Sequence, residues 1–237
     1  MAAGEVRLRP VRLRDAGAWS AVRTRDEEQL RPWEPTGTGV WRSRHHTTAW
    51  PGVCTSLRAA ARKGGMLPFV IELDGEFVGQ LTIGNVVRGA LRSAWCGYWV
   101  ATPVTGGGVA SAALALGVDH CFGAVGLHRV EATVRPDNGA SRTVLARAGF
   151  REEGLLRRYL DVDGDWRDHL LVALTAEEVT DSLAAALVAS GRAGWVCAAR
   201  ARRACPSRGA GVTSVTRVVL GFVAAVAPEE VSSCTTR

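Results

Sequence analysis

The chain has 237 residues, of which 47% are hydrophobic and eight are tryptophan, enough to fill the core of one large or two small domains. The net charge of +6 is distributed unevenly along the chain, because residues 181–237 alone hold seven Lys/Arg against three Asp/Glu. The basic charge is therefore weak support for nucleic-acid binding. The six cysteines form no CxxC pair and show no ligand spacing with histidine, which indicates neither a zinc site nor a disulfide framework.

The N-terminal segment reads as a strand followed by a helix. Residues 6–13 alternate apolar and basic side chains, which is the period of a half-buried strand. Asp15 then fits the N-cap of a helix that runs to about Arg25. Beyond it, Trp33 and Glu34 stand between two prolines, which predicts a stiff exposed loop whose simplest role is to pack against a sheet.

Two short helices are expected next. The first covers residue 41 to about residue 50 and stops at Pro51, because the residue before a proline disfavours the helical conformation. The second covers residues 56–63 and ends at two glycines. His45 and His46 are adjacent and would point in two directions on a helix, which favours a solvated face over a metal site.

Two strand pairs are predicted on either side of the central stretch. Residues 68–73 and 77–83 are rich in β-formers, and the Asp-Gly between them is a strong hairpin signal. Residues 151–160 and 166–174 form a second pair, with Gly164 in the connecting turn. The first pair is antiparallel and leads to a further strand, so the sequence predicts an α+β fold with a mixed, mostly antiparallel sheet.

The central stretch contains one parallel βαβ unit. An apolar strand at 94–100 leads through a glycine turn into a helix at 111–122, and a second strand at 128–135 follows. A helix start attracts anions, and glycines let main-chain amides approach a phosphate closely, so residues 106–110 are a candidate pyrophosphate cradle. Alone, the glycines are equally compatible with a turn that only reverses the chain.

The C-terminal residues differ in composition. We expect a domain over residues 6–178 and a tail over residues 181–237, rich in Ala, Arg, Val and Ser and mostly poorly ordered. Within the tail, residues 183–190 could continue a helix, and the apolar run at 218–227 is far shorter than the roughly 20 residues that a membrane span needs. No apolar signal core follows the first residues, and we expect a cytoplasmic protein.

Five separate pieces of the chain together resemble the GNAT (Gcn5-related) N-acetyltransferases. They are Gly-Tyr-Trp-Val at 97–100, Gly-Val-Ala at 108–110, Gly-Leu-His-Arg-Val-Glu at 126–131, Arg-Pro-Asp-Asn-x-x-Ser at 135–141 and Ala-Gly-Phe at 148–150. Within that family the chain looks most like the Rim type, which acetylates the N-terminal amines, often alanine, of ribosomal proteins. The resemblance extends over about residues 6–178.

The resemblance implies acetyl-CoA as cosubstrate and no metal. The pantetheine arm would pair with the strand near Val100 as an extra strand does, in a gap left by the next parallel strand, and the pyrophosphate would lie on the glycine turn. The implied cofactor-binding residues are Trp99, Val100, Ala101, Thr105, Gly106, Gly107, Gly108, Val109, Ala110, Asn138 and Ser141. Thr105 and Gly107 stand where relatives commonly carry polar or basic side chains, so a weaker CoA affinity is expected.

Catalytic and acceptor residues also follow from the resemblance. Ser141 is the implied proton donor, because Leu145 stands where many relatives have a tyrosine; a capping or solvent-facing serine is the competing interpretation. Leu160 stands where some relatives have the carboxylate that acts as the base, which leaves Glu34, Glu131 and Asp168, acting through water. For Glu131 a solvated strand carboxylate is the competing interpretation. The implied acceptor-binding residues are Trp33, Glu34, Tyr159 and Asp168.

Three functions remain open at this point. The first is an acetyltransferase for a ribosomal protein N-terminus, and the second is the same fold acetylating a small amine, which an acidic pocket would favour. The third is a CoA-binding module without useful turnover. We expect no direct contact with nucleic acid or membrane, and a monomer or a homodimer.

Overall fold

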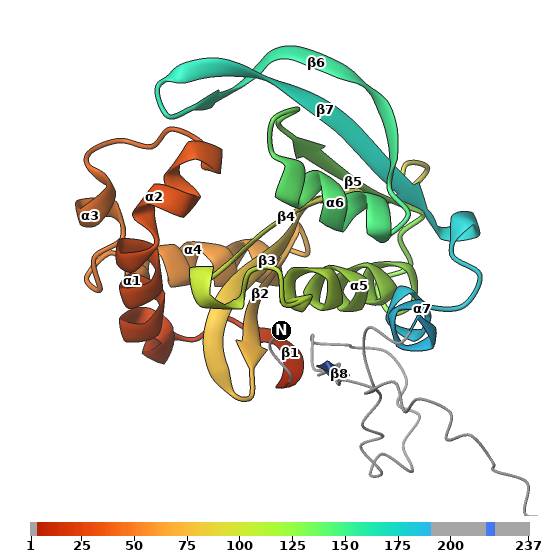
Figure 1. Cartoon of the computed structure of the whole chain (residues 1–237), viewed down its shortest axis with the longest axis horizontal. Helices are drawn as coiled ribbons and strands as arrows, with labels where there is room; N and C mark the ends of the chain where they lie inside the picture. Colours follow the sequence, from red (N-terminus) through yellow and green to blue (C-terminus); the bar gives the residue numbers. More distant parts are fainter. Residues whose placement is uncertain (1–3, 191–216, 221–237) are drawn as a thin grey trace, which may run out of the picture.

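The computed structural model describes residues 4–190 and 217–220, and within them the strands form one mixed sheet (Figure 1). The strand order is β6-β7-β5-β4-β3-β2-β1-β8. The strands are β1 (Gly4–Pro10), β2 (Met66–Leu73), β3 (Glu76–Val87), β4 (Ser93–Val100), β5 (Arg129–Val134), β6 (Arg151–Val162), β7 (Asp165–Thr175) and β8 (Arg217–Leu220). The helices are α1 (Ala16–Arg25), α2 (Glu27–Leu30), α3 (Trp41–Arg44), α4 (Trp50–Arg62), α5 (Val109–Phe122), α6 (Gly139–Arg147) and α7 (Leu183–Ala189), with short 3₁₀ turns η1 (Leu13–Asp15), η2 (Arg31–Trp33), η3 (Thr102–Val104) and η4 (Ala176–Glu178).

The sheet has a hydrophobic core on each face. On β2, Phe69 and Ile71 pack with α5, whereas Val70 between them packs with Trp19 of α1 and Trp50 of α4. This follows from strand geometry, because successive side chains point to opposite faces. The apolar run at 66–73 is therefore a strand buried on both sides, and the sheet is covered by helices on both sides, as Figure 1 shows.

Both predicted hairpins are confirmed. β2 and β3 pair antiparallel, and the turn between them has positive φ angles of 52° at Asp74 and 86° at Gly75, as a tight two-residue turn requires. β6 and β7 pair antiparallel around a similar turn at Asp163 and Gly164. In Figure 1 this long hairpin arches over the part of the molecule that holds α6.

The predicted end of a helix at Pro51 is wrong. α3 stops at Arg44, and a separate helix, α4, begins at Trp50 and continues through Pro51 to Arg62. Proline is well tolerated in the first turn of a helix, since the N–H that it lacks would have no partner there. Of residues 56–63, predicted as a helix of their own, residues 56–62 are the second half of α4 and Lys63 is its C-cap.

The βαβ unit contains the structural feature on which the site depends. α5 connects β4 to β5, and its residues Leu114, Leu116 and Val118 are fully buried, which explains why the sequence there is apolar all round. β4 and β5 are parallel, but they pair only where residues 93–95 meet residues 129–131. Beyond that point the two strands separate, which confirms the gap that the resemblance implies.

The described part of the chain continues past residue 181. The carboxylate of Asp119 on α5 accepts hydrogen bonds from Ser182 Oγ at 2.7 Å, Leu183 N at 2.8 Å and Ala184 N at 3.0 Å, and thereby fixes the start of α7. The helix predicted at 183–190 is thus confirmed. The expected poor order of the tail concerns mainly 191–216 and 221–237, outside the described residues, and the division into 6–178 and 181–237 stays a prediction.

Candidate active site

A cavity of about 1330 Å³ opens where β4 and β5 separate. Its walls come from β4 and the adjacent part of β3, the glycine turn before α5, the end of β5 with the start of α6, helices α1 and α2 with the loop around Trp33, and the β6–β7 hairpin. These segments are far apart in the sequence and meet only in the folded protein. Most of the site residues predicted from the sequence lie in the wall of this one cavity.

The glycine turn forms one end of the cavity. Gly106 and Gly108 have positive φ angles of 72° and 85°, and Gly108 is the N-cap of α5. The first-turn amides of α5, at Val109 and Ala110, have no intrahelical acceptors, so they face the cavity as free donors with the positive end of the helix dipole. Thr105 is less available, because its amide and its hydroxyl both bond to the carbonyl of Thr102, at 3.1 and 2.7 Å.

The β4 edge forms a second wall. Trp99 and Val100 line the cavity, whereas Ala101 is 4% exposed and does not line it. The Ala101 amide donates to the carbonyl of Val78 on β3 at 2.7 Å. Because successive amides of a strand point to opposite edges, the Val100 N–H points away from β3 and into the gap.

Ser141 lies beside a tyrosine that the sequence reasoning missed. Asn138 caps α6, its Oδ1 accepting from Ser141 N at 3.0 Å. The hydroxyls of Ser141 and Tyr98 share a hydrogen bond of 3.0 Å, and both residues line the cavity. Burial raises the pKa of Tyr98, although the bond to Ser141 opposes this. The signal for Tyr98 was available, since it is one of only two tyrosines in the chain and lies in the central strand.

Glu34 lies in the cavity wall but is held by cations. Its carboxylate forms an ion pair with Arg23, and Arg44 Nη2 lies 3.8 Å from it. The Arg23 guanidinium also lies 4.9 Å from the ring centre of Trp99. Burial, and to a lesser extent the charge of Arg44, lowers the pKa of Arg23 to about 9.

The predicted solvated position of the histidine pair is wrong for His45. His45 is 4% exposed, because its ring packs on Trp41 and its Nδ1 lies 2.9 Å from the Trp41 carbonyl. Burial lowers the pKa of His45 to about 4, so the ring is neutral and its Nε2 accepts from Arg23 Nη2 at 2.9 Å. His46 is exposed, as predicted.

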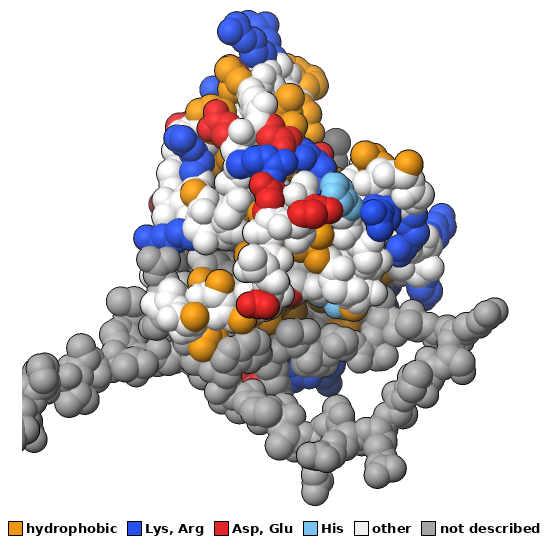
Figure 2. Space-filling model, turned by 90° about the vertical axis from the view of Figure 1, so that its right-hand side faces the viewer, with side chains coloured by type: hydrophobic (Ala, Val, Ile, Leu, Met, Phe, Trp, Pro, Cys, Tyr) orange, Lys and Arg blue, Asp and Glu red, His pale blue; other side chains and the backbone are white. Residues whose placement is uncertain are grey.

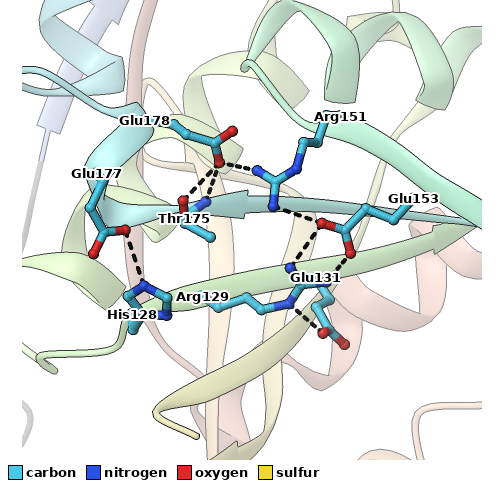
Figure 3. Close-up of polar contacts among 8 residues, drawn as sticks. All are labelled: His128, Arg129, Glu131, Arg151, Glu153, Thr175, Glu177 and Glu178. Carbon is cyan, nitrogen blue, oxygen red and sulfur yellow. Dashed lines mark hydrogen bonds and ion pairs between the residues drawn. The ribbon is translucent and has the colours of Figure 1, made fainter.

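Glu131 does not lie in the cavity wall. Figure 3 shows its carboxylate beside Arg129, whose Nε lies 2.6 Å away, in a chain of ion pairs that continues through Glu153 and Arg151 to Glu178. On the face drawn in Figure 2, acidic and basic side chains lie interleaved. The structure therefore places Glu131 in a network that ties the start of β5 to the start of β6 and to η4, directly after β7.

Asp168 and Tyr159 are also absent from the cavity wall. The Asp168 carboxylate accepts from the backbone N–H of Arg158 at 2.7 Å, where the chain has a positive φ of 48°. Tyr159 is 47% exposed and packs its ring against His169, with ring centres 5.6 Å apart. The structure brings His169, and not these two, to the cavity.

The loop around Trp33 roofs the other end of the cavity. Trp33 is 40% exposed, and the Arg135 guanidinium lies 5.0 Å from its ring centre and donates to the carbonyl of Pro32 at 3.0 Å. Thr36 binds Asp161 on the β6–β7 hairpin through its hydroxyl at 2.6 Å and its amide at 2.9 Å. The loop therefore packs on neighbouring elements and borders the cavity as well.

The described residues contain no group of three or more His, Cys, Asp and Glu side chains that could hold a metal ion. Cys54, Cys96 and Cys121 are buried free thiols, whereas Cys197, Cys205 and Cys234 lie outside the described residues. Within the same part of the chain, no helix is long and apolar enough to cross a bilayer.

Comparison with known proteins identifies the family. The family described as "Acetyltransferase (GNAT) domain" matches residues 5–151. The [ribosomal protein uS5]-alanine N-acetyltransferase of Escherichia coli is 30% identical over 175 residues, which cover 73% of this chain and 89% of the relative.

Comparison with solved structures supports the same family. The structure of Mycobacterium smegmatis RimJ in complex with CoA-disulfide has 68% identity and a TM-score of 0.80, covering 81% of this chain and 91% of that one. The ribosomal-protein-S5-alanine acetyltransferase of Vibrio fischeri has 26% identity and a TM-score of 0.66, covering 72% and 92%. The chain therefore belongs to the GNAT acetyltransferases, the family expected from its sequence, whose acyl donor is acetyl-CoA.

Proposed function

We propose that this protein transfers the acetyl group of acetyl-CoA to the N-terminal α-amine of a protein, and that the acceptor is a ribosomal protein. The observation that carries the proposal is the charge of the cavity wall. Among the described residues that line it, Glu34 is the only carboxylate, and it is paired with Arg23, while Arg135 and Arg147 add further positive charge. A basic cavity suits the phosphates of CoA and disfavours polycationic acceptors.

The cofactor would lie across the gap between β4 and β5. Its diphosphate would contact the amides of the glycine turn and of the first turn of α5, and its pantetheine arm would run along Trp99 and Val100. The free Val100 N–H would stabilise the carbonyl oxygen as it becomes anionic. Neither Thr105 nor Gly107 adds a charged side chain, so the contact depends on main-chain donors and the helix dipole.

Ser141 would protonate the departing thiolate of CoA. It opens α6 beside Tyr98, whose hydroxyl is 3.0 Å away, so a proton given up by Ser141 can be replaced through that bond. Asn138 keeps Ser141 in place through the cap of α6.

Because no described residue of the cavity wall supplies an unpaired carboxylate, an α-amine is favoured as acceptor over a lysine side chain. An α-amine has an ordinary pKa near about 7.7–8.0, whereas that of lysine is near about 10.4. An acceptor that is partly neutral at physiological pH needs only a modest base. The relatives named above support a ribosomal protein, because the E. coli and V. fischeri proteins carry names that specify alanine acetylation of ribosomal protein S5.

Purified protein incubated with acetyl-CoA and a panel of acceptors tests the proposal. The panel contains peptides with free N-terminal alanine, the same peptides blocked at the N-terminus but carrying an internal lysine, and a polyamine. We expect thiol release and a mass gain of one acetyl group only with the free N-termini. Faster turnover of the polyamine would contradict the proposal, and CoA binding without any turnover would favour a CoA-binding module instead.

The cellular form of the test compares the N-termini of ribosomal proteins, by mass spectrometry, in cells with and without this chain. We further propose that the protein works in the cytoplasm, where ribosomal proteins are made, as a monomer or homodimer. Unchanged ribosomal N-termini would contradict the choice of acceptor.

A further inference from the structure

Acetyl transfer to an amine requires a group that accepts a proton, and none of the carboxylates predicted for this role is free in the cavity. Glu34 is paired with Arg23. Glu131 is paired with Arg129, and Asp168 binds the Arg158 amide, both away from the described cavity wall. The proton acceptor therefore has to be sought among the other residues that line the cavity.

His169 is a buried residue of the cavity wall, and one of its two ring nitrogens has no hydrogen-bond partner among the described residues. It lies on β7, is 4% exposed and lines the cavity. Its Nδ1 lies 3.1 Å from the carbonyl of Arg167, which can only accept, so Nδ1 is the donor and Nε2 is the nitrogen that can accept a proton. Within residues 4–190, no protein group is bonded to Nε2.

His169 lies at the acceptor end of the cavity. β7 pairs with β5 so that Leu170 lies opposite Val134, which places His169 level with Arg135, the residue after β5. Arg135 in turn contacts Trp33 in the roof of the cavity. The ring of Tyr159 packs edge-on against the imidazole from β6 and limits its rotation.

We propose that Nε2 of His169 takes the proton from the acceptor amine. The amine nitrogen forms a bond to the acetyl carbon, the carbon–sulfur bond of the thioester breaks, and the amine proton passes to Nε2, directly or through one water. The thiolate takes a proton from Ser141, Ser141 regains one from solvent through the hydroxyl of Tyr98, and His169 returns its own proton to solvent. This inference rests on the proposed function, because it assigns a role within that reaction.

The groups around the imidazole are consistent with this role. The titratable or charged residues beside it are Tyr159 on β6, whose ring contacts it, Arg135 at the facing position after β5, and its chain neighbours Arg167 and Asp168 on β7. The Asp168 carboxylate is occupied by the Arg158 amide, so it does not form a His–Asp pair with the ring. The imidazole would therefore act alone as the base.

The test uses His169→Asn, since asparagine keeps an N–H near the position of Nδ1 for the Arg167 carbonyl but has no basic nitrogen. The matched control is His128→Asn, because His128 pairs with Glu177 at 3.1 Å and does not line the cavity. We expect His169→Asn to lower kcat/KM with an N-terminal peptide by about 10²- to 10⁴-fold, the usual contribution of a general base. CoA affinity by calorimetry and the thermal midpoint should match the wild type, as should the activity of the control.

Two further readouts separate a proton acceptor from a structural residue. The loss of kcat/KM in His169→Asn should become smaller as the pH rises, because more of the acceptor amine is then already neutral. In a second variant, His169→Ala, added imidazole should restore part of the activity. The inference is overturned if His169→Asn stays within about threefold of the control, or if neither imidazole nor high pH reduces the deficit. Wild-type protein that binds CoA but acetylates no peptide would instead refute the proposed function itself.

Discussion

The bond between Tyr98 and Ser141 permits a quantitative prediction. The hydroxyl of Tyr98 is 3.0 Å from that of Ser141, and in the proposed reaction it acts only by positioning and resupplying Ser141. Tyr98→Phe keeps the ring but removes this bond, which is worth about 0.5–1.5 kcal/mol. Since about 1.4 kcal/mol corresponds to tenfold in rate, kcat should fall roughly 2- to 12-fold. Ser141→Ala removes the proton donor itself and should cost about 100-fold or more.

The double variant decides between positioning and direct participation. If Tyr98 acts only through Ser141, adding Tyr98→Phe to Ser141→Ala should change kcat little further, so the coupling energy equals the whole effect of Tyr98→Phe. Steady-state kinetics with saturating acetyl-CoA measures each rate, and calorimetry checks that CoA affinity is kept. Additive losses, or a Tyr98→Phe variant as slow as Ser141→Ala, would refute this assignment and make Tyr98 the donor.

Three further predictions concern stability and the cofactor strand. Gly79→Ala would place a Cβ 2.2 Å from the Trp99 carbonyl oxygen, so it should lower the free energy of unfolding by about 1–3 kcal/mol and weaken CoA binding; a thermal midpoint equal to that of the wild type would contradict this. The pKa of His45 is about 4 in the folded protein, below the ordinary value of about 6.5. The stability that the neutral ring contributes is therefore present above about pH 6.5 and is lost as the pH falls toward 4. In chemical denaturation, the free energy of unfolding of a His45→Gln variant should fall less steeply between about pH 7 and about pH 5 than that of the wild type. Glu131→Gln should cost less than about 1 kcal/mol and leave turnover near the wild-type value, because the residue belongs to a surface ion-pair network; a large loss of kcat would restore it as a catalytic candidate.

The sequence correctly predicted those elements of the fold that depend on residues close together in the chain. Asp-Gly at 74–75 specified a hairpin, and the apolar helix predicted at 111–122 and observed at 109–122 specified a parallel crossover, because each is decided by residues close together in the chain. Pro51 misled the prediction because the same residue is unfavourable inside a helix and favourable at its start. Only the tertiary position of Trp50 in the core decides between the two.

The site was harder to predict because it depends on which face of a strand a side chain occupies. Asp168 and His169 are neighbours on β7, yet only His169 lines the cavity, since adjacent residues of a strand point to opposite faces. Sequence reasoning selected the carboxylate by its chemistry and missed the imidazole. Likewise, nothing local indicates that Arg23 will neutralise Glu34, because the two meet only after α1 and the loop pack together.

The roof of the cavity has a consequence for how the site is completed. The cofactor end is built mostly from one continuous stretch of chain, whereas the roof depends on Thr36 and Asp161, which are 125 residues apart in sequence. Contacts between distant residues have the larger loop-closure cost and are formed late during folding. Mild denaturant should therefore loosen the acceptor end first, leaving a protein that still holds coenzyme A after it has lost the ability to hold a peptide.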